Sequence, residues 1–152
     1  MNTKTAEIKT KNDYEIGRFS DSEILMAKLL RYVINLSKSE HANTQRILDR
    51  LNELSLLKTN WDGYGAMPIS KKIIKTVKNL LPMSEDKDWQ NWLVSPNVNA
   101  TLTFQSEKNR ASISLGEKEY SYYAVLNGKR LGESHIDFDA QKFLSLMRKL
   151  DQ

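Results

Sequence analysis

The feature that most restricts the fold of this chain is a change in hydrophobic period at Pro96. Before Pro96, apolar residues recur every three or four positions, as on one face of a helix; after it they alternate with polar residues, as on a half-buried strand. A run of helices followed by a run of strands is typical of an α+β protein. With 152 residues, 39% of them hydrophobic, the chain is long and apolar enough to form a hydrophobic core.

Two amphipathic helices are expected in the first part of the chain. Ser20-Asp-Ser-Glu23 is a capping box at the start of a helix near 21–37. Apolar residues keep helical spacing again over 41–58. Because neither Gly nor Pro interrupts 37–41, the sequence allows either two helices with a tight turn or one long bent helix.

A third helix is expected between Ser70, which can cap it, and Pro82, which ends it. Its apolar residues share one face, and Lys71, Lys75 and Lys78 share the opposite face. Such a stripe of lysines is usually a solvated face, but it is also a candidate contact for nucleic acid or an acidic partner.

An antiparallel meander and a final helix are expected after Pro96. The four predicted strands cover 98–104, 111–115, 120–126 and 129–138. Asn127-Gly128 is the preferred dipeptide for a type I′ hairpin turn between the last two strands. Asp139 can cap a helix that packs on one side of the sheet. The predicted fold is therefore α+β, with N-terminal helices, a four-stranded antiparallel β meander and a C-terminal helix.

The remaining composition narrows the class of protein. Residues 1–12 are rich in Thr, Lys and Asn and predict a mobile arm, which leaves 13–152 as a single α+β domain. Without cysteine there is no disulfide, thiol nucleophile or Cys-ligated zinc. No apolar stretch approaches the ~18 residues of a membrane span and the first residues do not resemble a signal peptide, so we expect a cytoplasmic protein without membrane contact.

Charge and motif searches point away from several activities. The net charge of +4 is spread along the chain rather than gathered in one segment, so it supports a nucleic-acid partner only weakly. No dinucleotide fingerprint, Walker loop, His-Glu-x-x-His or nucleophile elbow occurs. No cofactor and no metal are therefore expected.

The most distinctive segment is the loop of residues 60–70. Its glycines permit positive φ, its aspartate can accept hydrogen bonds from the amides ahead, and its two aromatics can anchor the turn in the core. This structural interpretation is the stronger one, and the alternative is that the aspartate or exposed aromatics form a functional site. The motif residues are Trp61, Asp62, Gly63, Tyr64 and Gly65.

The same stretch resembles the "WDGxGA-P" signature of small uncharacterised bacterial proteins. The resemblance covers about residues 60–126, with a helix over Ser70–Leu81 and a meander over Pro96–Tyr123 in the expected order. It implies no catalytic residue and no established activity. Because such proteins are often encoded on mobile elements, it implies an accessory role of the antitoxin, immunity or anti-defence type. The matching residues are Trp61, Asp62, Gly63, Gly65, Ala66 and Pro68.

Two further groups are candidate sites. Glu133, His135 and Asp137 alternate onto one face of the last predicted strand, where carboxylates beside an imidazole could hold a cation or tune proton transfer. The simpler interpretation is that these residues form the solvent-exposed face of a strand.

A two-histidine centre would require His41 and His135 to meet across the fold. With Lys129 and Arg130 to neutralise phosphate, a toxin-type nuclease is a minor alternative.

Tyrosines on the third predicted strand are the preferred candidates for partner contact. Alternation directs Tyr120 and Tyr122 to one face of the sheet and Tyr123 to the other, so one set can be core while the other is exposed. Exposed Tyr is favoured in protein interfaces. The expected function is thus a non-enzymatic protein-binding accessory protein, with a nucleic-acid-binding module as the alternative. The partner's identity and the oligomeric state, in which a homo-oligomer is possible, stay open.

Overall fold

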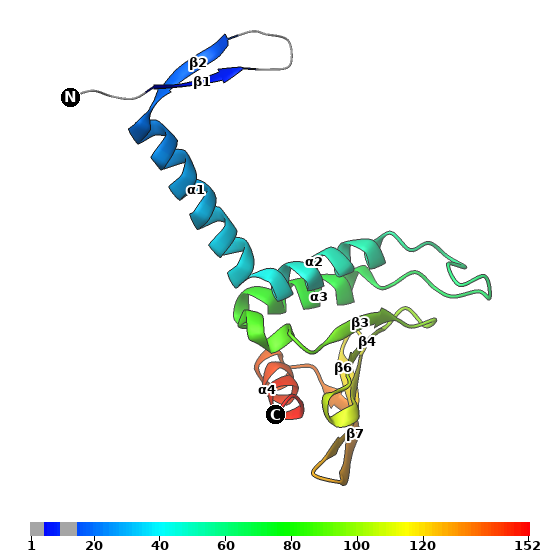
Figure 1. The fold of residues 1–152 in the computed structure, drawn as a ribbon. Helices are drawn as coiled ribbons and strands as arrows, with labels where there is room; N and C mark the ends of the chain where they lie inside the picture. Colours follow the sequence, from blue (N-terminus) through cyan, green and yellow to red (C-terminus); the bar gives the residue numbers. More distant parts are fainter. Residues whose placement is uncertain (1–4, 10–14) are drawn as a thin grey trace. The chain divides into compact units, whose positions relative to one another are not determined.

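The computed structural model describes residues 5–9 and 15–152 (Figure 1). Contacts between residues divide the chain into two compact units, Met1–His41 and Ala42–Gln152. The boundary predicted between an arm over 1–12 and a domain over 13–152 falls on residues outside the described ones.

The first unit contains a β-hairpin and a helix. β1 (Thr5–Lys9) pairs antiparallel with β2 (Glu15–Ser20), and α1 (Asp21–Glu40) follows at once. The Ser20 Oγ accepts a hydrogen bond from the Glu23 N–H at 3.3 Å, and the Glu23 carboxylate accepts one from the Ser20 N–H at 2.7 Å. The predicted capping box is therefore confirmed.

The segment 21–55 forms two helices rather than one long bent helix. The helix ends at Glu40, and His41 leaves helical geometry with φ −120°. α2 (Ala42–Ser55) then begins with the next residue. Two helices occupy the segment for which the sequence allowed one or two.

The second unit has the predicted α+β class, with five strands rather than four. Its sheet is antiparallel throughout, in the order β3-β4-β5-β6-β7. Its elements after α2 are α3 (Lys71–Leu80), the 3-10 turns η1 (Leu81–Met83) and η2 (Asp86–Trp89), β3 (Leu93–Pro96), β4 (Leu102–Ser106), the 3-10 turn η3 (Lys108–Arg110), β5 (Ala111–Leu115), β6 (Glu119–Leu126), β7 (Lys129–Asp137) and α4 (Ala140–Leu150).

The first predicted strand is displaced. Residues 98–101 form the turn between β3 and β4, because Ala100 adopts φ 70° and the Asn97 amide donates to Thr101 Oγ1 and Thr103 Oγ1 at 2.9 and 2.8 Å. Pairing starts only at Leu102. The added strand β3 lies before the expected change of period.

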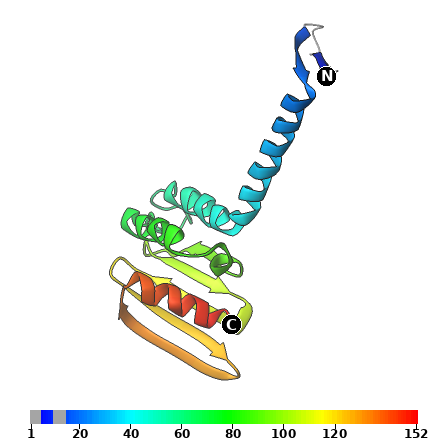
Figure 2. The same ribbon diagram turned by 90° about the vertical axis from the view of Figure 1, so that its left-hand side faces the viewer.

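One face of the sheet carries the core. Helices α2, α3 and α4 share a single cluster of buried side chains with this face, and Figure 2 shows α4 lying against the sheet. Phe143 of α4 packs edge-on against Tyr120 and Phe104, with ring centroids 5.2 and 5.7 Å apart. The prediction that the last helix covers one side of the sheet is confirmed.

Long-range polar contacts join α2 to the segment before the sheet. The Asp86 carboxylate accepts from the Thr44 N–H at 2.8 Å, in the first turn of α2. Arg46 donates to the carbonyls of Trp92 and Trp89 at 3.0 and 2.7 Å. These contacts hold the first turn of α2 against the η2 segment.

Both edges of the sheet resist further strand pairing. β3 is only four residues long and ends at Pro96. β7 carries Lys129 and Arg130 at its start and an irregularity in its pairing with β6. Short, charged and irregular edge strands disfavour edge-to-edge association.

Asn127 and Gly128 have φ 49° and 76°, as the predicted type I′ turn requires.

Candidate functional site

The loop of residues 60–70 is held by its own hydrogen bonds. Asn60 donates its N–H to the Ala66 carbonyl at 2.7 Å, and its side-chain oxygen accepts from Gly65 N–H at 2.7 Å. The Trp61 indole donates to the Met67 carbonyl at 2.9 Å. With φ of 80° at Gly63 and 96° at Gly65, the backbone uses the left-handed region that glycine tolerates. The loop is therefore a closed, preorganised turn.

Asp62 organises the tip of this loop. Its Oδ1 accepts hydrogen bonds from the Ala66 N–H at 2.9 Å and the Tyr64 N–H at 2.8 Å. These two bonds, with Ala66 the larger contributor, hold the pKa of the Asp62 carboxyl below its ordinary value. The predicted role of Asp62 in bonding the amides ahead is confirmed.

The two aromatics of the motif have different surroundings. Trp61 is half-buried, in keeping with its expected anchoring role. Tyr64 is 95% exposed, so the expectation that it anchors the turn in the core is wrong. Because Asp62 and Asn60 already fix the backbone, the fold does not need the Tyr64 ring. A rigid loop here presents an aromatic side chain to solvent.

Two exposed apolar residues, Met67 and Val98, lie at the same end of the second unit. The Met67 N–H donates to the Val98 carbonyl at 2.9 Å, which ties the loop to the turn between β3 and β4. Both side chains are more than half exposed. In Figure 1 the segment between α2 and α3 and the turn between β3 and β4 extend in the same direction. We call Tyr64, Met67 and Val98 the loop surface.

The tyrosines of β6 divide as alternation predicts. Tyr120 is buried against Phe143, and Tyr122 is half-buried on the same face. Burial, more than the nearby charge of Glu133, raises the pKa of the Tyr120 hydroxyl. The Tyr120 ring is therefore not available to a partner, because it packs beneath α4. Tyr123 is exposed on the opposite, open face.

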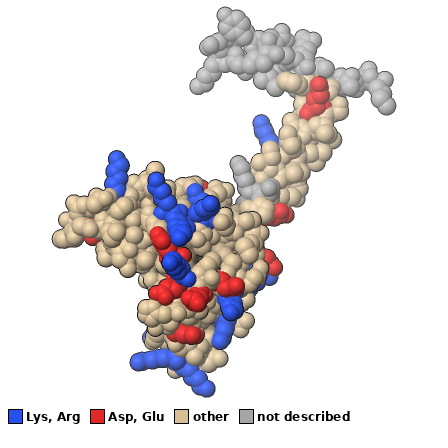
Figure 3. All heavy atoms as spheres, turned by 180° about the vertical axis from the view of Figure 1, so that it is seen from behind, with Lys and Arg blue, Asp and Glu red and all other residues tan. Residues whose placement is uncertain are grey.

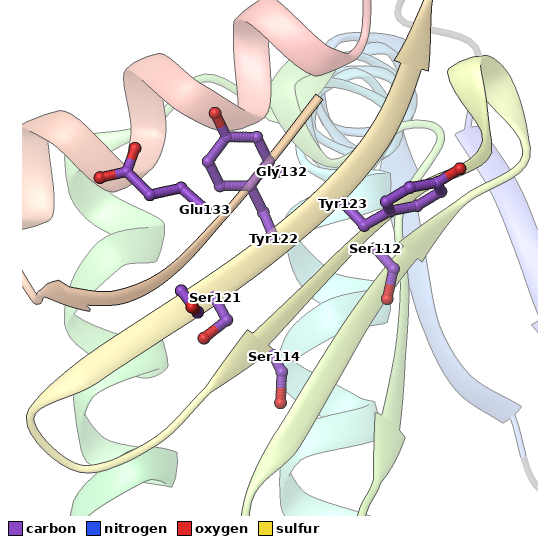
Figure 4. A pocket seen from close by; sticks show the side chains of 8 residues that line it. Ser112, Ser114, Ser121, Tyr122, Tyr123, Gly132 and Glu133 are labelled. Atoms are coloured by element: carbon purple, nitrogen blue, oxygen red, sulfur yellow. The ribbon is translucent and has the colours of Figure 1, made fainter. Parts of the chain in front are cut away.

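That open face is lined by hydroxyl groups. Figure 4 shows Tyr122 and Glu133 directed toward α4, whereas Ser112, Ser114, Ser121 and Tyr123 lie on the other side of the strands. A shallow depression of about 450 Å³ follows these residues and reaches Gly132 and Ser134 on β7. Its lining contains no cationic side chain and includes Glu133, so it does not suit phosphate binding.

The three lysines lie along α3 as expected. Lys71 and Lys75 are exposed, and the apolar residues of α3 are buried beneath the helix. Lys78 is half-buried and donates to the Asn52 side chain at 2.8 Å. On the face drawn in Figure 3, Lys and Arg of the second unit are interspersed with Asp and Glu. A partner contact by these lysines stays a prediction.

The strand carrying Glu133, His135 and Asp137 does not alternate regularly. Tyr122 pairs with Glu133 and Tyr120 pairs with Ile136, so β7 has one more residue than β6 over this stretch. His135 takes up the extra length with φ 57°. Glu133 and Asp137 consequently lie on opposite faces, and the expectation that all three share one face is wrong because of this bulge.

The imidazole of His135 has a partner that the sequence did not suggest. Its Nδ1 lies 2.8 Å from Glu119 Oε1, on the neighbouring strand, and both side chains are largely exposed. The His135 N–H also donates to Ser121 Oγ at 3.3 Å. His41 belongs to the first unit, and a two-histidine centre stays a prediction. Only cross-strand register could have identified Glu119.

Within the described part of the chain, no three His, Asp or Glu side chains are grouped so that they could hold a metal ion. Over those same residues, no helix has the length and apolar character needed to cross a bilayer. No protein-family model, curated protein or solved structure matches this chain.

Proposed function

We propose that this chain is a non-enzymatic protein-binding accessory protein, of the antitoxin, immunity or anti-defence type, that docks on a protein partner through the loop surface. The observation that carries the proposal is the 95% exposure of Tyr64 at the tip of a hydrogen-bonded loop. The resemblance of this segment to the WDGxGA-P proteins supports the accessory role.

The physical advantage lies in preorganisation. A Tyr ring buries a large area while immobilising few side-chain torsions, which is why Tyr is frequent among the residues that dominate interface energies. A loop already closed by Asn60 and Asp62 loses little further backbone entropy on binding. Met67 and Val98 extend the contact with apolar area.

The charge of the loop favours a protein over a nucleic acid. Residues 60–70 contain Asp62 and neither Lys nor Arg. Binding to nucleic acid draws most of its affinity from cationic contacts to phosphate. An apolar and aromatic surface without cations instead matches the anchor residues of protein interfaces.

The test compares two tyrosines that are both exposed. Tagged wild-type protein, Tyr64→Ser and the matched control Tyr123→Ser are used to capture partners from host lysate, with and without nuclease. We expect one stoichiometric protein that survives nuclease, is retained by the wild type and Tyr123→Ser, and is lost with Tyr64→Ser.

The affinity of the identified partner is then measured with purified proteins. Loss of an aromatic anchor costs about 2 kcal/mol or more, so the Kd should rise roughly 30-fold for Tyr64→Ser. An unchanged Kd would remove the loop surface from the proposal. Retention that disappears with nuclease would favour the nucleic-acid alternative instead.

A further inference from the structure

Helix α1 exposes many large apolar side chains in the described structure. Eight large apolar side chains of α1 are between 44% and 66% exposed, and none of them is buried in the described structure. They are Leu25, Met26, Leu29, Leu30, Tyr32, Val33, Ile34 and Leu36. In Figure 3 the drawn face of α1 is mostly uncharged.

These side chains form regular rows along the helix. Leu25, Leu29, Tyr32 and Leu36 follow one another at spacings of four, three and four residues, and we call this row the α1 seam. Met26, Leu30 and Val33 form a neighbouring row with the same spacing. Alternating spacings of three and four are the pattern by which two helices interlock side chains along a shared axis.

The polar side chains of α1 lie to one side of the two apolar rows. With 3.6 residues per turn, Arg31 lies about 130° from the α1 seam, whereas Lys28 and Asn35 border it. A groove between this helix and the hairpin is lined by Phe19, Ile24 and Ala27 together with Glu23, Lys28 and Arg31. Phe19 of β2 thus lies on this side of α1, and the described residues of the first unit leave the α1 seam exposed.

We propose that a second copy of this chain covers the α1 seam, so that the protein forms a dimer through paired α1 helices. Seven of the eight side chains, all except Ile34, lie in the α1 seam or in the row beside it. Since each is about half exposed and a large side chain offers on the order of 150 Å², two copies that cover them bury roughly 1,000 Å² in total. A specific protein interface needs about 1,000 Å² or more.

A second copy fits the chemistry better than a different protein. The seam is aliphatic, with one Tyr and no charge, as in permanent homodimer interfaces that resemble a divided core. Two identical seams are self-complementary under a two-fold axis, the commonest symmetry of oligomers. The second unit, with its loop surface, is not required for this pairing, so the inference stands independently of the proposed function.

The first test measures oligomeric state in solution by sedimentation equilibrium. Full-length wild type is compared with Leu29→Glu on the seam and with Arg31→Glu on the polar side, because both variants place a carboxylate near the middle of α1. We expect a dimer for the wild type and Arg31→Glu. Leu29→Glu should weaken dimerisation at least 100-fold. Fluorescence of the fully buried Trp89 and Trp92 reports whether the second unit stays folded in each variant.

The second test uses the absence of cysteine from the sequence. Leu29→Cys lies near the middle of α1, so its copy is close in either orientation of the paired helices. Under mild oxidation Leu29→Cys should form a covalent dimer, and Arg31→Cys, which is equally central but away from the seam, should stay largely monomeric. Equal cross-linking of both variants would contradict packing along the seam, whatever the behaviour of Leu29→Glu.

A membrane surface is the alternative occupant that the same experiments exclude or identify. Amphipathic helices with basic residues on the polar side can lie in a bilayer interface. Wild-type protein is sedimented with vesicles of phosphatidylcholine and phosphatidylserine. A wild type that is monomeric at all concentrations tested would overturn the dimer, and binding to the vesicles would then assign the seam to lipid.

Discussion

The ion pair between Asp88 and Arg148 provides a sharp test of how α4 is held to the core. Asp88 lies in η2, and its side chain is only 5% exposed. Arg148 of α4 donates to its two oxygens at 3.0 and 2.8 Å. The Glu85 N–H is a further donor at 2.8 Å. Arg148→Met would keep the aliphatic stem and remove both charged hydrogen bonds.

The structure sets the expected size of the effect. Breaking a buried ion pair costs about 3–5 kcal/mol because the remaining charge is left unpaired. Arg148 is 46% exposed, so water reaches the pair and screens it. We therefore expect Arg148→Met to lower the free energy of unfolding by about 2 kcal/mol. In an Asp88→Asn background no carboxylate is left unpaired. There the same substitution should lower the free energy of unfolding by less than about 1 kcal/mol.

The effect should also depend on pH. The hydrogen bonds from Arg148, which outweigh burial, hold the pKa of Asp88 below its ordinary value of 3.8. Because the folded pKa is depressed, the ionised pair stabilises the fold above pH 3.8 and this stabilisation is lost as the pH falls through the folded pKa. Wild type and Arg148→Met should therefore differ at neutral pH and converge in acid.

Urea unfolding followed by tryptophan fluorescence measures this directly, since Trp89 and Trp92 are fully buried. With a typical slope of about 1–3 kcal/mol per molar urea, the midpoint should move by about 1 M at neutral pH. A shift of the same size at pH 7 and in acid, or equal shifts in both backgrounds, would refute the assigned role of the pair.

Three further substitutions test local features of the second unit. Asp62→Ala should speed hydrogen exchange of the Ala66 amide, because this amide donates a hydrogen bond to the Asp62 carboxylate in the wild type. An unchanged exchange rate would show that the loop stays closed without the carboxylate. Asp86→Ala should lower the free energy of unfolding by about 1 kcal/mol in urea titrations, because the first turn of α2 loses an acceptor for its N–H groups. Gly128→Ala should cost about 1 kcal/mol in the same assay because of its φ of 76°; Lys129→Ala, which has no such φ, serves as the control and should stay within about 0.5 kcal/mol.

Features that depend on neighbouring residues could be predicted from the sequence. The capping box of α1, the amphipathic α3 and the type I′ turn at Asn127-Gly128 all follow from local backbone chemistry. The hydrogen bonds of Asp62 to the amides ahead belong to the same group. For these features, the interacting atoms lie within about one turn of each other along the chain.

Features that depend on distant segments could not be predicted. The bulge at His135 and its contact with Glu119 arise from the register of β7 against β6, and alternation within one strand does not contain that information. The first turn of α2 is capped by Asp86, 42 residues away in the chain. The short strand β3 exists because β4 offers it a partner.

Hydrophobic period and turn chemistry act locally, so the order and type of most elements could be predicted from the residues alone. Which side chains remain outside the core depends on tertiary packing. Tyr64 is exposed because Asp62 and Asn60 already close its loop, and Tyr120 is buried because α4 covers its face of the sheet. Burial depends on what packs against a residue, and that is a property of the whole fold rather than of its own segment.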